Sequence, residues 1–355
     1  MNLPYTVAPP RRATISDVAR EAGTGKTSIS RYLNGELSVL SPELRARIEA
    51  AIERLDYQPN QMARGLKRGR NRLVGMLVAD LTNPYSVEVL QGVEAACHAL
   101  GYMPLICHAA NEVEMERRYL QLLTTYRVEG VIVNAVGVRE ETLRPVGDGG
   151  IPAVLVDRTV DGLVADRVGL DNTAAAELGT RHLLEQGFDD LWFVVQPFER
   201  VSSRRLREAA FHAVLGGQTR ARGHTVVLDL GDAAVVEQTL AELDQALDAA
   251  LARHAAPANT RGRIALFAAN APVALSLARH LNARHGARWQ ELVALLSIDD
   301  PEWAELTGIT TIRQPTYQIG WRAVEFLHER IAGGAADARD CLLRGELVVR
   351  ASTSR

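Results

Sequence analysis

The spacing of apolar residues along the chain changes near residue 73. Before it, apolar positions recur every three to four residues in short segments, and after it short unbroken apolar runs alternate with longer amphipathic stretches. The first pattern is typical of small helices, and the second of buried strands that are covered by helices. The pattern therefore predicts a small helical N-terminal part followed by a large α/β part.

The apolar runs of the large part lack the period-two alternation of a half-exposed sheet, so we expect strands that are buried on both faces. They lie at residues 73–79, 103–107, 131–133, 154–156, 193–195, 226–228, 264–267 and 293–296. Amphipathic stretches between them, such as 87–100 and 114–126, predict helices. These units are too many for one sheet. The sequence predicts two doubly wound α/β lobes with a ligand cleft between them.

Three short helices are expected before residue 58. Thr14 or Ser16 can cap the first, the second covers residues 26–33, and Ser41 followed by Pro42 begins the third. The first two helices, joined by a short glycine-containing turn, form a helix-turn-helix.

The outward face of the second helix carries short hydrogen-bond donors and cations. Its residues Lys26, Thr27, Ser28 and Arg31 lie near the helix start, where a recognition helix meets base edges in the major groove. The alternative is an ordinary exposed face, which these residues alone do not exclude.

Charge is segregated along the 355 residues. The net charge is -3, but residues 1–72 hold 13 Lys and Arg against 7 Asp and Glu, and the remainder is acidic. A basic head on an acidic body suits contact with DNA phosphates, because its cations release counterions from the duplex. A solvated basic surface would have the same composition.

Residues 59–72 connect the two parts and are rich in cations. The helical pattern there spans only about two turns, below the roughly 12 to 15 residues at which isolated helices become stable in water. We expect a hinge helix that folds only on DNA. An ordinary basic linker is the alternative.

The segments ATISDVA (13–19), SISRYLN (28–34) and YQPN (57–60) resemble the head of the lactose-repressor (LacI/GalR) family. The resemblance implies that Leu66, paired with its copy in a second subunit, enters the minor groove. Thr24 and Gly25 depart from the valine and serine usual in the family, which puts the base preference in doubt. The expected DNA contacts are Thr14, Ser16, Lys26, Thr27, Ser28, Arg31, Asn34, Tyr57, Asn60, Ala63, Arg64 and Leu66.

The resemblance also implies the domain organisation, including chain crossings near Asp171, Arg313 and Leu342 that make each lobe discontinuous. The expected parts are a flexible arm at 1–12, a helix-turn-helix domain at 13–58, a hinge helix and linker at 59–72, and a core at 73–355. Within this core of the periplasmic-binding-protein-like type, the N-lobe takes 73–171 and 314–341 and the C-lobe takes 172–313 and 342–355.

Ligands of doubly wound folds lie beyond the carboxyl ends of the strands, so polar residues that follow the apolar runs are candidates. The expected effector contacts are Asn83, Tyr85, Ser86, Asp157, Arg158, Ser203, Arg207, Asn270, Asp300, Trp303 and Gln314. Tyr85 is expected to lie against a sugar ring. A turn at Asn83 and helix caps at Asp157 or Asp300 are the structural alternatives.

The chemistry of this set favours an acid. The family usually has Asn-Asp where this chain has Asn270-Ala271, so a carboxylate that would repel an anion is missing. Arg158, Arg204 and Arg207 offer forked donors for a carboxylate. Residues 61–70, 78–80, 83–86 and 299–303 resemble the 2-ketogluconate and related sugar-acid repressors of the family.

The sequence thus predicts a cytoplasmic transcription repressor, a homodimer or tetramer on a near-palindromic operator, that a small effector releases. We expect no cofactor, no metal and no catalytic residue, since no catalytic motif is found. Residues 23–27 end like a phosphate-binding loop, but Arg20 stands where that motif needs glycine. The alternatives are a sugar-binding protein without DNA function, and a regulator that uses a neutral sugar or a corepressor.

Overall fold

A computed structural model describes residues 12–59, 70–135, 150–160, 164–198, 201–254, 263–334 and 337–354. The chain divides into two compact units, Met1–Asn71 and Arg72–Arg355. The hinge residues Asn60, Ala63, Arg64 and Leu66 lie outside the described residues, so the predictions made for them stay predictions.

The first unit holds three α-helices: α1 (Ile15–Glu21), α2 (Lys26–Leu33) and α3 (Pro42–Arg54), with a 3-10 turn, η1 (Leu37–Val39). Thr14 caps α1 in a reciprocal capping box with Asp17, and Ser41 caps α3 by accepting from the N–H of Leu44. Gly25 stands at the N-cap of α2 and provides no side-chain bond. Val18, Ile29 and Ile48 are fully buried at the centre of its small core.

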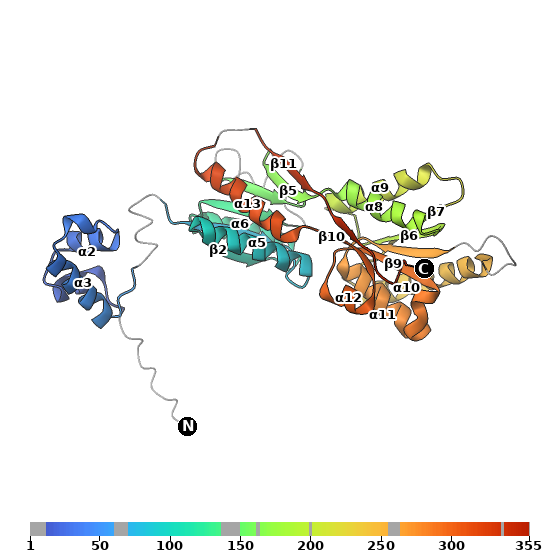
Figure 1. Cartoon of the computed structure of the whole chain (residues 1–355), viewed down its shortest axis with the longest axis horizontal. Helices are drawn as coiled ribbons and strands as arrows, with labels where there is room; N and C mark the ends of the chain where they lie inside the picture. Colours follow the sequence, from blue (N-terminus) through green and yellow to red (C-terminus); the bar gives the residue numbers. More distant parts are fainter. Residues whose placement is uncertain are drawn as a thin grey trace, which may run out of the picture. The chain divides into compact units, whose positions relative to one another are not determined.

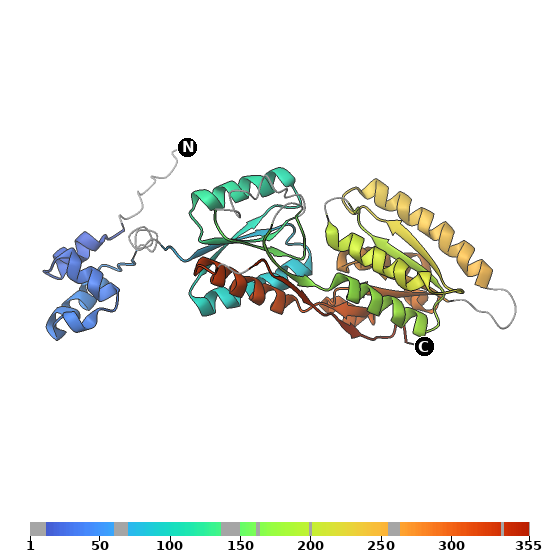
Figure 2. The ribbon, with the colours of Figure 1, turned by 90° about the horizontal axis from the view of Figure 1, so that it is seen from above.

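The second unit contains two six-stranded sheets (Figure 1). The first has the order β11-β5-β4-β3-β1-β2 and is parallel throughout. Its strands are β1 (Leu73–Val78), β2 (Met103–His108), β3 (Gly130–Asn134), β4 (Ala153–Val156), β5 (Asp166–Leu170) and β11 (Asp340–Leu343). Helices α5 (Pro84–Leu100) and α13 (Thr316–Ile331) pack on one face, and α6 (Val113–Thr125) packs on the other (Figure 2).

The second sheet has the order β12-β10-β9-β8-β6-β7, with only β12 antiparallel to its neighbour. Its strands are β6 (Asp190–Val195), β7 (Arg222–Val227), β8 (Ile264–Ala268), β9 (Val293–Ile298), β10 (Thr310–Arg313) and β12 (Glu346–Val348). Helices α8 (Asn172–Glu185) and α9 (Ser202–Gly216) pack on one face. Helices α10 (Ala233–His254), α11 (Ala271–His285) and α12 (Glu302–Thr307), with the 3-10 turn η3 (Gly286–Glu291), lie on the other.

The chain passes between the sheets three times, after β5, after β10 and between β11 and β12. The third passage follows Leu343. The carbonyl of Leu343 accepts from the N–H of Asp171 at 2.7 Å, and this bond joins the third passage to the first, which begins at Asp171. Each lobe is therefore built from separate segments of the chain.

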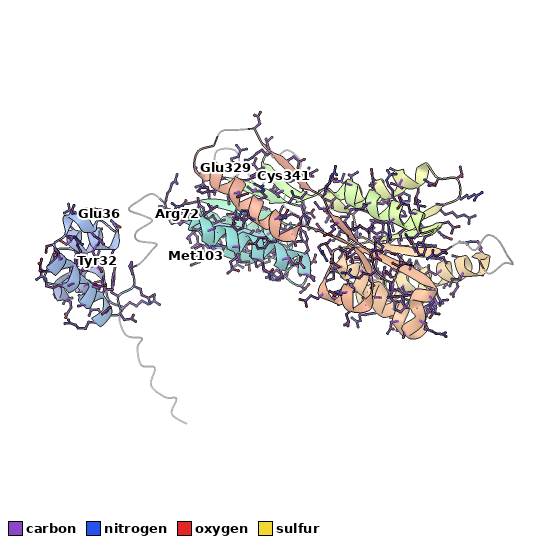
Figure 3. The ribbon with its side chains drawn as sticks, in the orientation of Figure 1. Tyr32, Glu36, Arg72, Met103, Glu329 and Cys341 are labelled. Atoms are coloured by element: carbon purple, nitrogen blue, oxygen red, sulfur yellow. The ribbon has the colours of Figure 1, made fainter. Side chains whose placement is uncertain are left out.

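Two strands do not have the burial that their apolar runs predicted. β2 and β7 are edge strands, and part of each is exposed; Met103, at the start of β2, has an exposed fraction of 62%. Met103 and Cys341 mark the two edges of the first sheet (Figure 3). The prediction of strands buried on both faces was wrong there, because an edge strand is covered less completely than an inner one.

Helices α5 and α13 cross in close contact. A Cβ at Gly92 would lie 2.1 Å from the carbonyl oxygen of Tyr317, and one at Gly320 would lie 2.1 Å from that of Val89. Both positions therefore require glycine, since any side chain would force the helix axes apart. Among the helices of the described ranges, none is long and apolar enough to cross a membrane.

Candidate functional site

A cavity of about 1650 Å³ lies between the two lobes of the second unit, at the carboxyl ends of strands from both sheets. Ten of the eleven expected effector contacts line its wall. They are Asn83, Tyr85, Ser86, Asp157, Arg158, Ser203, Arg207, Asn270, Trp303 and Gln314. The fold thus brings together residues from six separate loops and helix starts, although their contact with a ligand stays a prediction.

Arg207 is the most buried cation of this wall, with an exposed fraction of 5%. It projects from α9, and its Nε donates to Oδ1 of Asn172 at 2.6 Å while its Nη1 donates to the carbonyl oxygen of Ala269 at 2.6 Å. Both acceptors are neutral. Within the described part of the chain, Nη2 has no hydrogen-bond partner, so the guanidinium keeps both its charge and a donor for a ligand.

Two aspartates that follow strands adopt left-handed backbone conformations. Asp157 follows β4 with φ 62°, and Asp299 follows β9 with φ 78°. Such conformations are costly for residues other than glycine and concentrate at functional sites. Asp299 accepts from the N–H of Ala271 at 2.9 Å and from Nε2 of Gln314 at 2.5 Å. Burial raises the pKa of its carboxyl group, and Arg207 opposes that shift.

The wall holds three further arginines: Arg158, Arg204 and Arg279. Arg158 donates from Nη1 to the carbonyl of Ala135, and its buried Nε has no hydrogen-bond partner in the described ranges of the chain. Arg204 donates to the carbonyl of Pro197 at 2.6 Å and to Oε1 of Gln196 at 2.9 Å. The same Gln196 oxygen accepts from Nδ2 of Asn270 at 2.7 Å, which links α9 to the start of α11.

Asn83 and Asn270 also act as helix caps. Asn83 accepts from the N–H of Tyr85 at the start of α5, and Asn270 accepts from the N–H of Val273 at the start of α11. The structural and the functional interpretations of these residues are therefore compatible, because one side chain caps a helix and lines the cavity.

Tyr85 differs from expectation. Its ring is part of the apolar core of the N-lobe, with an exposed fraction of 7%, so its face is not free to lie against a sugar ring. Its hydroxyl group is buried at the cavity wall and has no hydrogen-bond partner within the part of the chain that the structure describes. Burial, with Asp157 and Asp299 nearby, raises the pKa of this hydroxyl well above its usual value.

Asp300 does not line the large cavity. Its carboxylate binds Arg350 and Arg313, each at 2.7 Å, and Oγ1 of Thr311 at 2.7 Å. Burial opposes ionisation, but these partners lower the pKa of Asp300 below its usual value. The neighbouring Asp299 lines the cavity instead. Sequence reasoning named Asp300 and not Asp299, because both follow the same strand and only the backbone turn decides which one faces the large cavity.

Three residues were missed altogether. Asn134 is the last residue of β3 and Gln196 directly follows β6. Both line the cavity, so the strand-end rule could have found them. Asn172 lies behind the wall, and its contact with Arg207 joins residues 35 positions apart. No local pattern indicates such a pair.

In the first unit, Lys26, Thr27 and Arg31 are exposed on α2, while Ser28 and Asn34 are half-buried. Thr14 and Ser16 are half-buried at α1, where Thr14 serves as the cap. Tyr57 packs against the helical core. The exposed cations of α2 thus have the placement expected of a recognition surface, whereas Thr14 and Tyr57 also have structural roles.

Two family models match the chain. Residues 14–60 match bacterial regulatory proteins of the lacI family, and residues 180–353 match the periplasmic binding protein-like domain. The first match coincides with the helical unit and the second falls within the α/β unit.

Relatives match almost the whole length. The chain is 42% identical to the HTH-type transcriptional regulator PtxS of Pseudomonas aeruginosa, over 98% of both chains. It is 33% identical to the HTH-type transcriptional regulator KdgR of Bacillus subtilis, over 96% of this chain and 97% of that one. A crystal structure of the lac repressor dimer bound to operator and an anti-inducer superposes with a TM-score of 0.80 at 24% identity, over 97% and 99% of the two chains.

Proposed function

This chain belongs to the lacI family of bacterial regulatory proteins, and we propose that it represses transcription until a sugar acid occupies the cavity between its lobes. Membership makes it a DNA-binding helix-turn-helix transcription regulator and not an enzyme. What the proposal adds is the effector, the residues that bind it and the direction of the response.

One observation carries the choice of an acid. Arg207 is buried at the cavity wall, is held by two neutral oxygens and keeps Nη2 free of any partner within the described residues. A buried guanidinium is stabilised by an anion, and its fork suits a carboxylate. A neutral sugar would leave this charge without a direct counterion.

The formal charges of the cavity wall balance as a whole. Four arginines (Arg158, Arg204, Arg207 and Arg279) stand against four aspartates (Asp80, Asp157, Asp229 and Asp299), so the choice of an acid rests on the surroundings of Arg207 and not on the net charge. Ala271 contributes no charge at the start of α11. The hydroxyl groups of a sugar acid find acceptors in Asp299 and hydrogen-bonding amides in Asn134 and Asn270.

For DNA binding we propose that two chains place their α2 helices in successive major grooves of a near-palindromic operator. The exposed Lys26, Thr27 and Arg31 would reach base edges and phosphates. The effector draws the lobes together and the DNA-binding geometry is lost. Coupling is reciprocal, so operator DNA must weaken effector binding by the same factor.

One titration tests the DNA-binding surface and the effector cavity separately. The full chain is bound to a fluorescent fragment of its own upstream DNA, and sugar acids such as D-gluconate and 2-keto-D-gluconate are titrated while anisotropy is followed. We expect sugar acids to release the DNA fragment and D-glucose to leave it bound. Arg31→Ala should lose the DNA but keep acid binding measured by calorimetry, and Arg207→Leu should keep the DNA but no longer respond.

Two results contradict the proposal. If neutral sugars alone release the DNA, the effector is not an anion. If an acid makes DNA binding tighter, the direction of the response is opposite to the one proposed. The operator affinity should also fall steeply as salt is raised, because phosphate contacts release counterions.

A further inference from the structure

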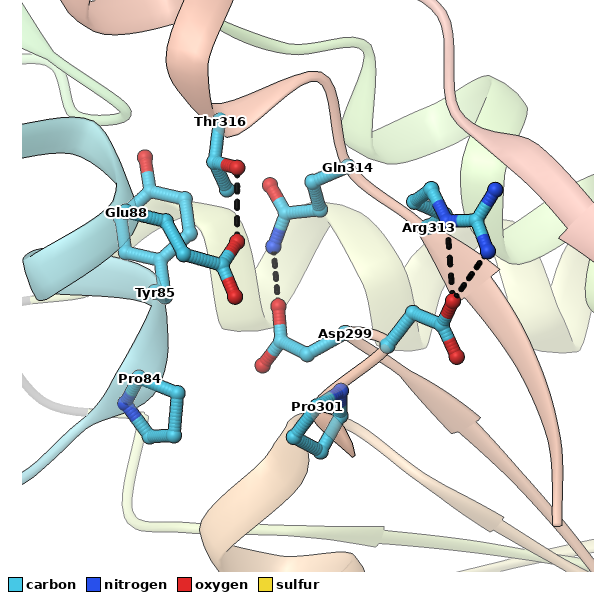
Figure 4. Close-up of a pocket in the computed structure, with 9 residues that line it drawn as sticks. Pro84, Tyr85, Glu88, Asp299, Pro301, Arg313, Gln314 and Thr316 are labelled. Atoms are coloured by element: carbon cyan, nitrogen blue, oxygen red, sulfur yellow. Dashed lines mark hydrogen bonds and ion pairs between the residues drawn. The ribbon is translucent and has the colours of Figure 1, made fainter. Parts of the chain in front are cut away.

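A side chamber of about 220 Å³ opens beside the large cavity, where α5 and the start of α13 face the C-lobe. Tyr85, Asp299 and Gln314 line both spaces, so the two adjoin. Figure 4 shows the residues that surround it, and they come from both lobes: Pro84, Tyr85, Glu88 and Thr316 on one side, and Asp299, Asp300, Pro301, Arg313 and Gln314 on the other.

Two buried polar atoms on its wall have no hydrogen-bond partner among the residues that the structure describes: Oε1 of Gln314 and the hydroxyl of Tyr85. The side chains are 6% and 7% exposed. An unsatisfied buried polar group is costly, and in native proteins such groups commonly receive a water or a ligand.

The orientation of Gln314 determines which chemistry the chamber accepts. Its Nε2 donates to Asp299 at 2.5 Å, so the amide cannot be reversed without losing that bond, and Oε1 remains as an acceptor that needs a donor. Tyr85 can donate or accept. A group that both donates and accepts, namely a hydroxyl, satisfies the two atoms together.

The charges of the chamber disfavour an anion. Glu88 is held by Oγ1 of Thr316 at 2.7 Å, and burial raises the pKa of its carboxyl group. Asp300 is neutralised by Arg313 and Arg350. No side chain of the chamber wall among the described residues offers an unpaired cation, so the carboxylate of a ligand belongs near Arg207 and a neutral end belongs here.

We propose that the side chamber binds the terminal hydroxyl of an open-chain sugar acid, the end opposite to its carboxylate. This rests on the proposed function and deepens it, because the chamber then selects the acid by the group at its far end. Tyr85 belongs to the N-lobe, whereas Gln314 is bonded to Asp299 of the C-lobe, so a ligand seated there contacts both lobes.

The experiment compares D-gluconate with 6-deoxy-D-gluconate, which lacks only the terminal hydroxyl, by calorimetry on the full chain. We expect the wild type to prefer D-gluconate about tenfold, the worth of one well-made hydrogen bond. Tyr85→Phe should bring this ratio close to one. Its fold should persist, because the lost hydroxyl has no partner. Tyr317→Phe, an exposed residue outside both spaces, is the matched control and should keep the wild-type ratio.

Equal affinities for the two acids in the wild type, or an unchanged ratio in Tyr85→Phe, would mean that water fills the chamber, and the inference is then wrong. The proposed function is judged separately, by release of the operator across the panel of sugar acids. Absence of any gluconate binding overturns the chamber inference, while release by another acid leaves the proposed function standing.

Discussion

Arg207 and Asn172 are joined by a hydrogen bond of 2.6 Å between two helices of the C-lobe, and Asn172 extends the contact to the other lobe. Its Nδ2 donates to the carbonyl of Leu170 at 3.1 Å and to Oδ1 of Asp157 at 3.3 Å. Asn172 is the first residue of α8, directly after the chain passes from one sheet to the other. The guanidinium proposed to hold the ligand is thus oriented from the point where the lobes join.

Replacing Asn172 should weaken effector binding although this residue does not line the cavity. In Asn172→Ala the Nε of Arg207 loses its acceptor and the guanidinium can rotate, so we expect a loss of about tenfold to a hundredfold, or ~1.4 to 2.8 kcal/mol. Calorimetry with the active sugar acid measures it. Thr173→Ala, an exposed neighbour, is the control. Unchanged affinity in Asn172→Ala would show that Arg207 does not depend on this contact.

Introducing a carboxylate at Ala271 should reverse the preference for acids. Ala271 is 2% exposed on the cavity wall, and its N–H donates to Asp299. In Ala271→Asp a further negative charge faces the ligand, and we expect the affinity for a sugar acid to fall at least about tenfold while neutral sugars gain a partner for their hydroxyls. Thermal-shift measurements across both classes test this. Ala271→Asn adds no charge and should retain the preference for acids over neutral sugars. If Ala271→Asp and Ala271→Asn give the same result, charge is not the cause.

Asp166 should be among the largest single contributors to the stability of the N-lobe. Its carboxylate is fully buried and binds Arg330 at 2.8 Å and Arg339 at 3.0 Å. Asp166→Asn removes the buried counterion that Arg330 and Arg339 share, although Arg339 keeps Glu329, and we expect a loss of about 3 to 5 kcal/mol in the free energy of unfolding. Asp340→Asn breaks an ion pair with Arg167. Because the Asp340 side chain is 54% exposed, the free energy of unfolding should fall by about 1 kcal/mol or less. Denaturant unfolding of both variants gives the comparison.

The same group predicts a pH dependence. Burial alone would raise the pKa of Asp166, but the hydrogen bonds from Arg330 and Arg339 lower it below its usual value. Because the folded state holds the proton less tightly than the unfolded state, stability is fully present above the unfolded pKa, about 3.9, and falls as the pH drops below it. Asp166→Asn should therefore flatten the fall in the free energy of unfolding between pH 5 and 3. A variant with the wild-type slope would assign acid unfolding to other carboxyl groups.

The crossing of α5 and α13 should not tolerate a methyl group. In Gly92→Ala the new Cβ would meet the carbonyl of Tyr317, so we expect a loss of about 1 to 3 kcal/mol and a lower melting temperature. Gly216→Ala, at the end of α9, has nothing within 4 Å and should be neutral or slightly stabilising. Equal melting temperatures for the two variants would show that the helices can separate at no cost.

The helical unit was predictable nearly residue by residue, because its signals are local. Thr14 and Ser41 mark helix starts through bonds to residues three positions away, Pro42 takes the first position of its helix, and the apolar spacing defines the buried faces. The sequence also predicted strands wherever apolar runs were unbroken. It missed β5, β10, β11 and β12, which carry polar residues such as Asp166 and Arg313 within their bounds. Their pairing depends on partners far along the chain.

By itself the sequence determined the order of parts, the capped helices of the DNA-binding unit, the α/β class of the rest and ten residues that the fold places on one cavity wall. Only the tertiary structure decided that Asp299 and not Asp300 faces that cavity, that the ring of Tyr85 is core, and that Asn172 orients Arg207. Caps and periodicities act over a few residues, whereas the direction in which a strand-end side chain points is decided by backbone turns and by partners that folding brings from elsewhere in the chain.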